Sequence, residues 1–312
     1  MDLHWRSFFQ EVEKDEGMNT KFKMHDLIHD LALSVSRSEC ALVNSNANNV
    51  STFIRKNLST LVKANKLRTF ILACDPWVSV GETMEESTLK TLISSFRYLR
   101  ASDLHGLKIN ILSNIIGTLM HLKYLDLSSN DIEVLPSSIT KLVNLQILKL
   151  SMCVNLKELP IDIKKLVSLK YLDINGCKNL SHMPCGFGQL TSLQTLNLSK
   201  CEKLSELPVD IQKMVSLKHL DLKDCENLTH MPCGLGQLTS FQSLNLFVVS
   251  KGSSKHCGGL AELNKLNDLR GKINIINLAW VKDATSEFKA ANLKEKQYLN
   301  ELELRWNLEG NE

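Results

Sequence analysis

The sequence predicts an α/β fold in which short repeats stack into a solenoid with a curved parallel sheet. The first observation is a pattern that recurs between Leu119 and Leu246: leucines spaced Leu-x-x-Leu-x-Leu, then an Asn or Cys, then a Leu-Pro or Met-Pro step. The second is its regularity, because the prolines of successive copies, at positions 136, 160, 184, 208 and 232, are all 24 residues apart. Such a fixed period is typical of solenoids.

The pattern predicts one strand per repeat. The last two leucines of each copy are two residues apart, so they point to one side of a strand and the residue between them points to the other. Parallel stacking buries these leucines in a shared core that one repeat cannot form alone. Each buried Leu or Ile contributes about 1.5 to 3 kcal/mol, more than a single polar contact. The Asn or Cys ends the strand and turns inward, and after the proline the chain returns as an irregular or short helical segment.

Ahead of the repeats, residues 1–40 predict a small, mostly helical module. Residues 1–16 carry apolar side chains at helical spacing, which indicates an amphipathic helix. A short strand over 21–24 then leads to Asp26, a good N-cap for a second helix. Together these elements are typical of the end of a winged-helix domain. Residues 41–66 are polar and rich in asparagine, which predicts a surface connection to the repeats.

The solenoid is expected over residues 67–312, with regular repeats at 119–246 and irregular ones on either side. Its irregular elements are predicted as strands at 67–72, 98–104, 272–276 and 301–305 and a helix near 88–96. Residues 167–198 and 215–246 nearly match each other, which indicates duplication of a pair of repeats.

Composition excludes several classes of partner. The chain has 312 residues and is 43% hydrophobic, enough for a substantial core. Its 37 basic and 34 acidic residues are interspersed and leave a net charge of +3, so neither nucleic acid nor a membrane surface is an expected partner. Apolar runs are too short to span a bilayer, and the amino terminus lacks the layout of a signal peptide. The expected location is the cytosol or the nucleus.

Of the nine cysteines, those at the strand-ending position of the repeats are expected to be reduced core thiols rather than disulfides, and no zinc site is expected. Four of them, Cys153, Cys177, Cys201 and Cys225, occupy the position that ends the strand. Neighbouring parallel strands hold Cβ atoms about 4.8 Å apart, farther than the usual value of about 3.8 Å in a disulfide. The sequence His-Met-Pro-Cys occurs at 182–185 and again at 230–233, but these copies are roughly 10 Å apart, too far to share one zinc ion.

No Ser/His/Asp or Cys/His group can be placed together on the repeats, so no catalytic site is predicted. The outward strand positions are more informative. They form three columns: Tyr124, Ile147, Tyr171, Thr195, His219 and Ser243; then Asp126, Lys149, Asp173, Asn197, Asp221 and Asn245; then Ser128, Ser151, Asn175, Ser199, Lys223 and Phe247.

Tyrosines beside charged residues are typical of protein-recognition surfaces, although any polar sheet face carries some such residues. The candidate partner contacts are Tyr124, Asp126, Lys149, Tyr171, Asp173, Asn197, His219, Asp221 and Lys223.

Two stretches near the amino terminus, Trp-Arg-Ser-Phe-Phe-Gln at 5–10 and Lys-Met-His-Asp-Leu-Ile-His-Asp-Leu-Ala at 23–32, resemble the last part of the nucleotide-binding region of plant NB-LRR disease-resistance proteins of the coiled-coil class. In that family Met-His-Asp is a switch motif, and leucine-rich repeats follow it directly. Residues 259–273 and 293–306 are also similar to later repeats of its members. The resemblance implies a leucine-rich-repeat module for recognition and autoinhibition in plant innate immunity. Its protein partners would be a pathogen effector, a guarded host protein or the nucleotide-binding domain of a full-length receptor.

The resemblance also implies a role for His25, flanked by Met24 and Asp26: facing the β-phosphate of bound ADP. The alternative is that His25 merely edges a helix. The sequence contains no Gly-x-x-x-x-Gly-Lys-[Ser/Thr] loop to cradle phosphates, since Gly271-Lys272 is followed by Ile. We therefore favour the alternative and expect no cofactor in this chain, although ADP and ATP serve the full-length family.

Two other interpretations fit parts of the sequence. An extracellular receptor ectodomain would use the Asn-x-Ser/Thr sequons at Asn49, Asn57, Asn179, Asn197 and Asn227. The amino-terminal sequence and the Leu-Pro step, where extracellular plant repeats have Gly-x-Ile-Pro, disfavour it. A non-functional truncated gene product is the other, because the strand over 301–305 would leave an unpaired edge near the carboxyl end.

Overall fold

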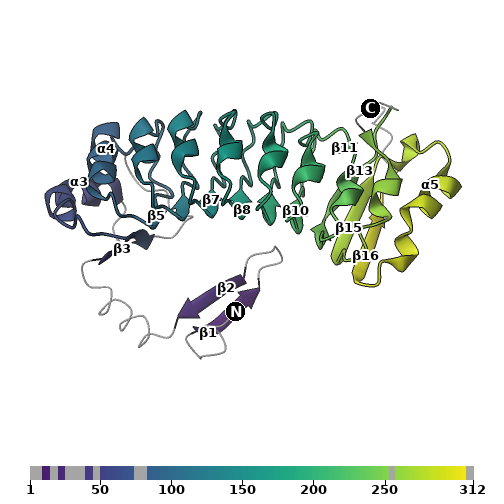
Figure 1. Ribbon diagram of the computed structural model, residues 1–312, viewed down its shortest axis with the longest axis horizontal. Helices are drawn as coiled ribbons and strands as arrows, with labels where there is room; N and C mark the ends of the chain where they lie inside the picture. Colours follow the sequence, from purple (N-terminus) through teal and green to yellow (C-terminus); the bar gives the residue numbers. More distant parts are fainter. Residues whose placement is uncertain are drawn as a thin grey trace.

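The computed structural model describes residues 9–14, 20–24, 39–44, 50–73, 83–252 and 257–306. Within them, nine parallel strands lie side by side in chain order, one per repeat (Figure 1). The α/β leucine-rich-repeat solenoid is therefore confirmed. The strands are β3 (Cys40–Asn44), β4 (Thr69–Ala73), β5 (Ala101–Asp103), β6 (Tyr124–Asp126), β7 (Ile147–Lys149), β8 (Tyr171–Asp173), β9 (Thr195–Asn197), β10 (His219–Asp221) and β12 (Ser243–Leu244).

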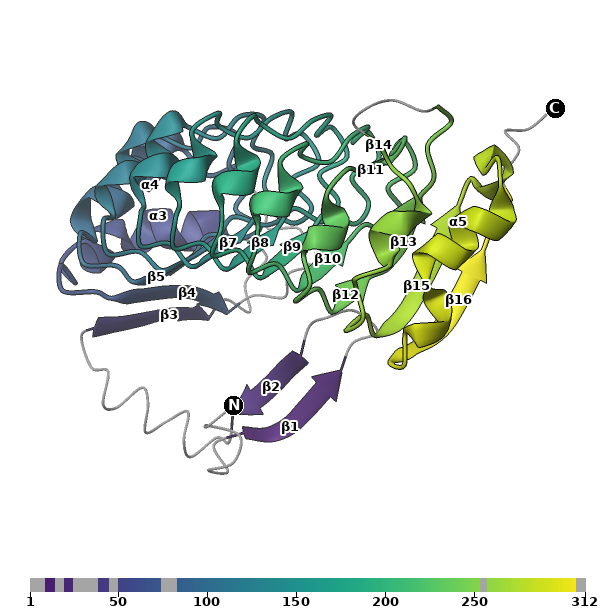
Figure 2. The same ribbon diagram turned by 45° about the vertical axis from the view of Figure 1, so that its right-hand side comes forward.

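Helical turns form the return segments and lie on the side opposite the strands, as Figures 1 and 2 show. The long ones are α3 (Val50–Leu61), α4 (Glu86–Ser95) and α5 (Ala284–Ala291). The regular repeats have only short 3-10 turns: η2 (Asn114–Thr118), η3 (Ser137–Lys141), η4 (Ile163–Lys165), η5 (Phe187–Gln189), η6 (Ile211–Lys213) and η7 (Leu235–Gln237). No helix in the described ranges is long and apolar enough to cross a membrane.

The core runs the length of the solenoid between the strands and the helical turns. The patterned leucines, such as Leu125, Leu127 and Leu148, are fully buried, as the repeat predicts. At Gly188 two successive turns lie in close contact, because a Cβ there would lie 2.0 Å from the carbonyl oxygen of Asp210. Close stacking of successive turns therefore requires glycine at that position.

The residue that ends each strand also makes a hydrogen bond to the neighbouring repeat. The Sγ atoms of Cys153, Cys177, Cys201 and Cys225, the ladder cysteines, each donate to a backbone carbonyl of the preceding repeat, at 3.1 to 3.3 Å. All four are buried free thiols, as expected. Burial is the main cause of their raised pKa, which for Cys153 and Cys225 is about 12. These cysteines are thus neutral donors at physiological pH.

Asn130 takes the same place in an earlier repeat and makes more bonds. Its Nδ2 donates to the carbonyls of Leu104 at 2.9 Å and Leu127 at 2.8 Å, and its Oδ1 accepts from the backbone N–H of Ile109 at 2.9 Å. In the cysteine repeats, by contrast, the backbone itself closes the turn, as where Cys153 N–H donates to the Leu150 carbonyl at 3.1 Å. The amide thus joins three segments of backbone.

After β12 the regular sheet gives way to a separate three-stranded parallel sheet of β13 (Leu246–Val248), β15 (Gly271–Ile276) and β16 (Leu299–Leu304). The two later strands appear where 272–276 and 301–305 predicted them. Phe247 was expected to face outward, and that prediction is wrong: it is fully buried. It pairs with Ile275, also fully buried, so the change of sheet turns this position inward. A short antiparallel pair, β11 (Met231–Pro232) with β14 (Cys257–Gly258), lies beside the junction.

Two predictions for the amino-terminal part are corrected. Residues 9–14, expected within a helix, form strand β1 (Phe9–Lys14), which pairs antiparallel with β2 (Thr20–Met24). The register sets residue 11 opposite residue 23 and residue 13 opposite residue 21. The predicted strand at 21–24 is confirmed. The mostly helical character expected of residues 1–40 is therefore not found in their described part.

The second correction concerns the connecting segment. Residues 41–66 hold most of β3 and all of α3, and β3 pairs with β4 along five residues. The regular sheet therefore starts one strand earlier than residue 67. Its Asn-rich stretch suggested a loop, but Val50, Phe53, Ile54 and Leu58 carry a helical spacing inside it, and Ile54 is fully buried.

Candidate functional site

The outward residues of β6 to β10 and β12 form the candidate site, which we call the strand face. The strand register sets the first predicted column at facing positions from β6 to β12: Tyr124, Ile147, Tyr171, Thr195, His219 and Ser243. It does the same for the second column over five strands: Asp126, Lys149, Asp173, Asn197 and Asp221. All nine candidate contacts lie on this face or in the turn that follows it.

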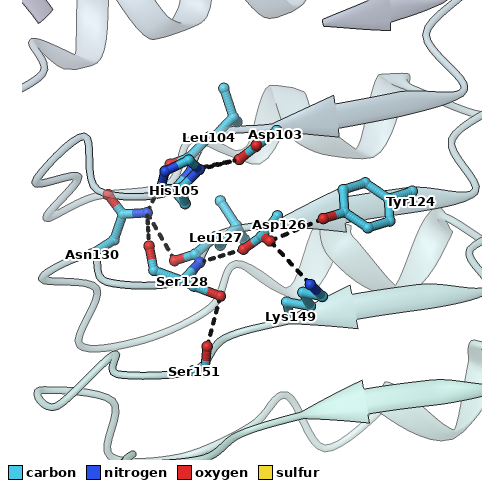
Figure 3. A network of polar contacts seen from close by, with 10 residues as sticks. All are labelled: Asp103, Leu104, His105, Tyr124, Asp126, Leu127, Ser128, Asn130, Lys149 and Ser151. Atoms are coloured by element: carbon cyan, nitrogen blue, oxygen red, sulfur yellow. Dashed lines mark hydrogen bonds and ion pairs between the residues drawn. The ribbon is translucent and has the colours of Figure 1, made fainter. Parts of the chain in front are cut away.

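The best-connected part of the face surrounds Tyr124 (Figure 3). The Tyr124 hydroxyl donates to Oδ2 of Asp126 at 3.0 Å, and Nζ of Lys149 lies 3.7 Å from the same oxygen. The Lys149 ammonium also lies 5.8 Å from the centre of the Tyr124 ring. Burial, followed by the Asp126 charge, raises the pKa of Tyr124 far above its ordinary value, so the phenol stays protonated.

Tyr171 repeats this arrangement two strands away. Its hydroxyl is hydrogen-bonded to Asp173, and burial, then the Asp173 charge, raise its pKa in the same way. Both rings remain partly exposed, whereas the neighbouring Asp126 and Asp173 are buried. The face therefore presents fixed aromatic rings whose hydroxyls are already bonded within the protein.

The second column, which we also call the acidic column after Asp126, Asp173 and Asp221, closes turns of the backbone. The sequence analysis did not predict this role. Oδ1 of Asp126 accepts the backbone N–H of Ser128 at 2.9 Å, two residues along the chain. The same bond is made by Asp103 to residue 105, Asp173 to residue 175, Asn197 to residue 199 and Asp221 to residue 223, at 3.0 to 3.1 Å. Such bonds are typical of Asp and Asn at turns, so the residue type alone was a usable signal.

Lys149 is the exception in this column. It replaces the capping Asp or Asn, and its ammonium supplies positive charge between Asp126 and Asp173. Burial is the main cause that raises the pKa of Asp173; the Asn175 backbone N–H and Lys149 lower it, and the charges of Asp126 and Asp221 raise it.

The network extends beyond the predicted residues to β5. Asp103 and His105 are both buried, and His105 Nδ1 lies 2.6 Å from Oδ1 of Asp103 (Figure 3). Asp103 faces Asp126 across the sheet, so the acidic column begins one strand earlier than expected. The sequence offered a signal, because Asp103-Leu-His repeats the spacing of Asp126-Leu-Ser.

At the other end of the face, Nδ1 of His219 is buried and has no partner among the described residues. Burial, then the nearby Lys218, lower the pKa of His219. Asn245 lies beyond β12 and bonds back to β10: its Oδ1 accepts the Leu222 N–H at 2.8 Å and its Nδ2 donates to Asp221. These contacts link the end of β12 to the end of β10.

Met24 is the last residue of β2, while His25 and Asp26 lie outside the described residues, so the predicted ADP-facing group remains a prediction. Within the part of the chain that the structure describes, no group of three His, Cys, Asp or Glu could hold a metal. Nδ1 of His182 instead lies 2.9 Å from the Ser181 hydroxyl, and Cys185 is exposed.

Comparisons with known proteins agree with this architecture. A family described as "Leucine-rich repeat region" matches residues 78–166 and 161–311, and one described as "Disease resistance protein Winged helix domain" matches residues 1–32. A putative disease resistance protein RGA4 from Solanum bulbocastanum is 48% identical over 52 residues, 17% of this chain and 5% of that protein. Disease resistance protein RGA2 from the same plant is 65% identical over 34 residues, 11% of this chain and 3% of that protein. The matches thus span a small fraction of these relatives.

Two solved structures show the same fold at low identity. An internalin from Listeria monocytogenes has a TM-score of 0.54 and 16% identity, covering 80% of this chain and 64% of the internalin. The Arabidopsis receptor kinase HAESA, solved with the peptide hormone IDA and the co-receptor SERK1, has a TM-score of 0.54 and 17% identity, covering 79% of this chain and 43% of the kinase chain. At these identities the likeness concerns the fold alone.

Proposed function

Because this chain belongs to the leucine-rich-repeat proteins, and to the plant NB-LRR disease-resistance proteins among them, we propose that its strand face recognises a protein partner in the defence response. The observation that carries the proposal is the row of part-exposed side chains of Tyr124, Ile147 and Tyr171 on adjacent strands. Aromatic anchors on a rigid support lose little conformational freedom when they bind, and such residues dominate protein interfaces.

Rigidity of the support comes from the backbone and the turn bonds. Each of β6 to β10 is paired on both sides, and, except at Lys149 on β7, the Asp or Asn of the second column closes the turn after these strands. The rings of Tyr124 and Tyr171 are also held by their hydroxyl bonds to Asp126 and Asp173. The face is thus organised before a partner arrives, as a recognition surface requires.

The partner classes we propose are a pathogen effector, a guarded host protein, or the nucleotide-binding domain of a full-length receptor, in the cytosol or the nucleus. In the last case the chain would act in autoinhibition. The extracellular alternative receives less support, because the sequon amides serve the fold: Nδ2 of Asn179 donates to the Val154 carbonyl at 2.9 Å and Nδ2 of Asn227 to the Glu202 carbonyl at 2.6 Å. A glycan would have to be attached at those same nitrogens.

Proximity labelling in leaves tests recognition. The chain, fused to a biotin ligase, is expressed as wild type, as Tyr124→Ala/Tyr171→Ala, and as a control, Val143→Ala/Val167→Ala, at two exposed positions away from the strand face. We expect a set of proteins that the strand-face variant fails to label and the control labels normally. Identical labelled sets for all three chains would refute the proposed face.

Autoinhibition has its own readout. When the nucleotide-binding region of a disease-resistance receptor is expressed alone and causes cell death, co-expression of this chain should suppress it. The Tyr124→Ala/Tyr171→Ala variant should lose that suppression, while equal suppression by the variant and the wild type would exclude the strand face as the contact.

A further inference from the structure

The strand face carries a second, longer period. The residue just before each strand and the first residue of that strand form a pair, and the pairs alternate along the sheet. On one strand, or rung, the pair is a lysine followed by an aromatic or imidazole ring; on the next it is a glutamine followed by a smaller side chain. The first kind comprises Lys123-Tyr124, Lys170-Tyr171 and Lys218-His219, and the second Gln146-Ile147, Gln194-Thr195 and Gln242-Ser243. The acidic column follows the same rhythm, with Asp126, Asp173 and Asp221 on the lysine rungs and Lys149, Asn197 and Asn245 on the others.

Backbone hydrogen bonds align the residues just before the strands, Lys123, Gln146, Lys170, Gln194, Lys218 and Gln242, in one row across the sheet. The Lys123 carbonyl accepts the N–H groups of Gln146 at 2.8 Å and Ile147 at 3.0 Å, and the Gln146 carbonyl accepts those of Lys170 and Tyr171 at 2.8 and 3.0 Å. The same pair of bonds recurs on the later strands. At the last of them the Lys218 carbonyl accepts the N–H groups of Gln242 at 2.7 Å and Ser243 at 3.0 Å. Since the backbone bonds are equivalent on every rung, the alternation lies in the side chains alone.

In the described ranges none of Lys123, Lys170 and Lys218 makes a side-chain hydrogen bond or ion pair, and the first two are exposed. Lysines elsewhere on the repeats commonly do: Lys157 Nζ lies 2.6 Å from Glu133, and Lys178 Nζ lies 2.7 Å from Glu202. Between residues 123 and 219 the row and the adjacent first column contain no acidic residue. The row is therefore a line of unneutralised positive charge beside part-exposed rings.

Its spacing selects the shape of a ligand. Neighbouring strands lie about 4.8 Å apart, so like rungs lie about 9.6 Å apart. A polyproline II helix has three residues per turn at about 3.1 Å each, so every third residue returns to the same face after about 9.3 Å. Aromatic-lined surfaces are the usual docking sites for that conformation.

We propose that the strand face binds an extended, proline-containing acidic peptide segment in polyproline II conformation, with a carboxylate at every third residue, lying across the strands. Each carboxylate meets one lysine of the row, while the intervening prolines lie against Tyr124, Tyr171 and His219. This proposal rests on the proposed recognition function and names the partner's chemistry.

Charge explains why a peptide suits the face better than a nucleic acid. Asp126, Asp173 and Asp221 lie two residues along each strand from the first-column rings, so a uniformly charged phosphate backbone would meet repulsion beside the lysine row. A peptide can place its acids on the lysine side alone. An α-helix fits the spacing less well, because at about 1.5 Å per residue it has no whole number of turns between like rungs.

The test uses fluorescence anisotropy with synthetic nonapeptides and the whole chain. One peptide repeats Glu-Pro-Pro three times, a second has the same composition with its three glutamates adjacent, and a third repeats Lys-Pro-Pro. We expect the periodic acidic peptide to bind about ten-fold more tightly than the clustered one, as several exposed ion pairs formed together allow, and the lysine peptide not to bind. Equal binding of the two acidic peptides, or preference for an oligothymidylate over both, would overturn the proposal.

Two sets of variants connect the effect to the row. Lys123→Gln/Lys170→Gln/Lys218→Gln installs the residue of the neighbouring rungs and should weaken the periodic peptide about ten-fold. The control Lys141→Gln/Lys157→Gln/Lys203→Gln removes the same charge from exposed positions off the row and should leave binding unchanged. Conversely, Gln146→Lys/Gln194→Lys makes every rung from β6 to β10 basic and should remove most of the preference for periodic over clustered acids.

The two proposals fail differently. If the lysine triple variant binds all peptides as the wild type does, the periodic ligand is excluded, while loss of labelled partners in the tyrosine double variant would still support recognition. If the tyrosine variant labels the same proteins as the wild type but the peptide preferences hold, the lysine row binds peptides and the proposed defence partner is excluded.

Discussion

Asn130 provides the most quantitative test of how the repeats are held together. Its side chain is almost fully buried and satisfies the Ile109 N–H and the Leu104 carbonyl, and it shares the Leu127 carbonyl with the thiol of Cys153. Asn130→Ala therefore leaves two buried backbone groups without their side-chain partner. At about 1 to 3 kcal/mol for each unsatisfied group, we expect a loss of about 2 to 6 kcal/mol in the free energy of unfolding.

Asn130→Cys distinguishes the contribution of the Ile109 N–H from that of the Leu104 carbonyl. A thiol at this position can donate to the Leu104 carbonyl as Cys153 donates to that of Leu127, so only the Ile109 N–H loses its partner and the expected loss is about 1 to 3 kcal/mol. Cys177→Ala removes one weak bond to the Leu150 carbonyl and one buried sulfur, for about 1 kcal/mol.

Urea denaturation followed by circular dichroism measures these losses from the midpoints and slopes. The expected order of stability is wild type, Cys177→Ala, Asn130→Cys and Asn130→Ala. As a control, Asn144→Ala removes an exposed amide that makes one bond, to the Met120 carbonyl at 2.9 Å, and should cost about 0.5 to 1.5 kcal/mol. If Asn130→Ala were no less stable than Asn144→Ala, the hydrogen bonds of the buried amide would not be what stabilises this turn.

Three further changes test other features of the fold. Gly188→Ala should lower the thermal midpoint by several degrees because its Cβ would overlap the Asp210 carbonyl, whereas Gly259→Ala, with open space around it, should not; equal midpoints would refute close stacking at Gly188. The wild type should gain stability as pH falls through the raised pKa of Asp173, because the folded state then binds a proton more tightly than the unfolded chain. Asp173→Asn keeps the turn acceptor and should lose that gain without losing stability at neutral pH, as urea midpoints at neutral and mildly acidic pH would show. After brief maleimide treatment, mass spectrometry should find Cys185 modified. The ladder cysteines should be modified only after urea is added, because burial keeps them protonated; labelling of the ladder cysteines in native protein would contradict their burial.

At Phe247 and within residues 41–66 the structure differs from what the sequence predicts. Both errors come from extending a local pattern past the place where its pairing partner changes. Phe247 follows the outward spacing of the earlier repeats, but it pairs with β15 rather than with the regular sheet. The segment 41–66 has the composition of a loop, yet β3 finds a partner in β4. In each case the deciding residue is distant in sequence.

The candidate site divides in the same way. The columns of outward residues were predictable, because a strict repeat length and the alternation of a strand fix which residues face each other. What they do there was not. The turn-closing bonds of Asp126 and Asp173, the hydroxyl bond of Tyr124 and the buried nitrogen of His219 depend on side-chain geometry that no spacing specifies.

The sequence by itself determined the solenoid, its strand register and its core, because buried leucines at a constant period leave one way to stack the repeats. The tertiary structure alone decided where the sheet is interrupted, how the Asn130 amide and the ladder cysteines join neighbouring repeats, and which acidic side chains are already used by the fold. These depend on contacts between residues of different repeats. Burial energy follows from side-chain type, whereas a hydrogen bond depends on where both of its atoms lie.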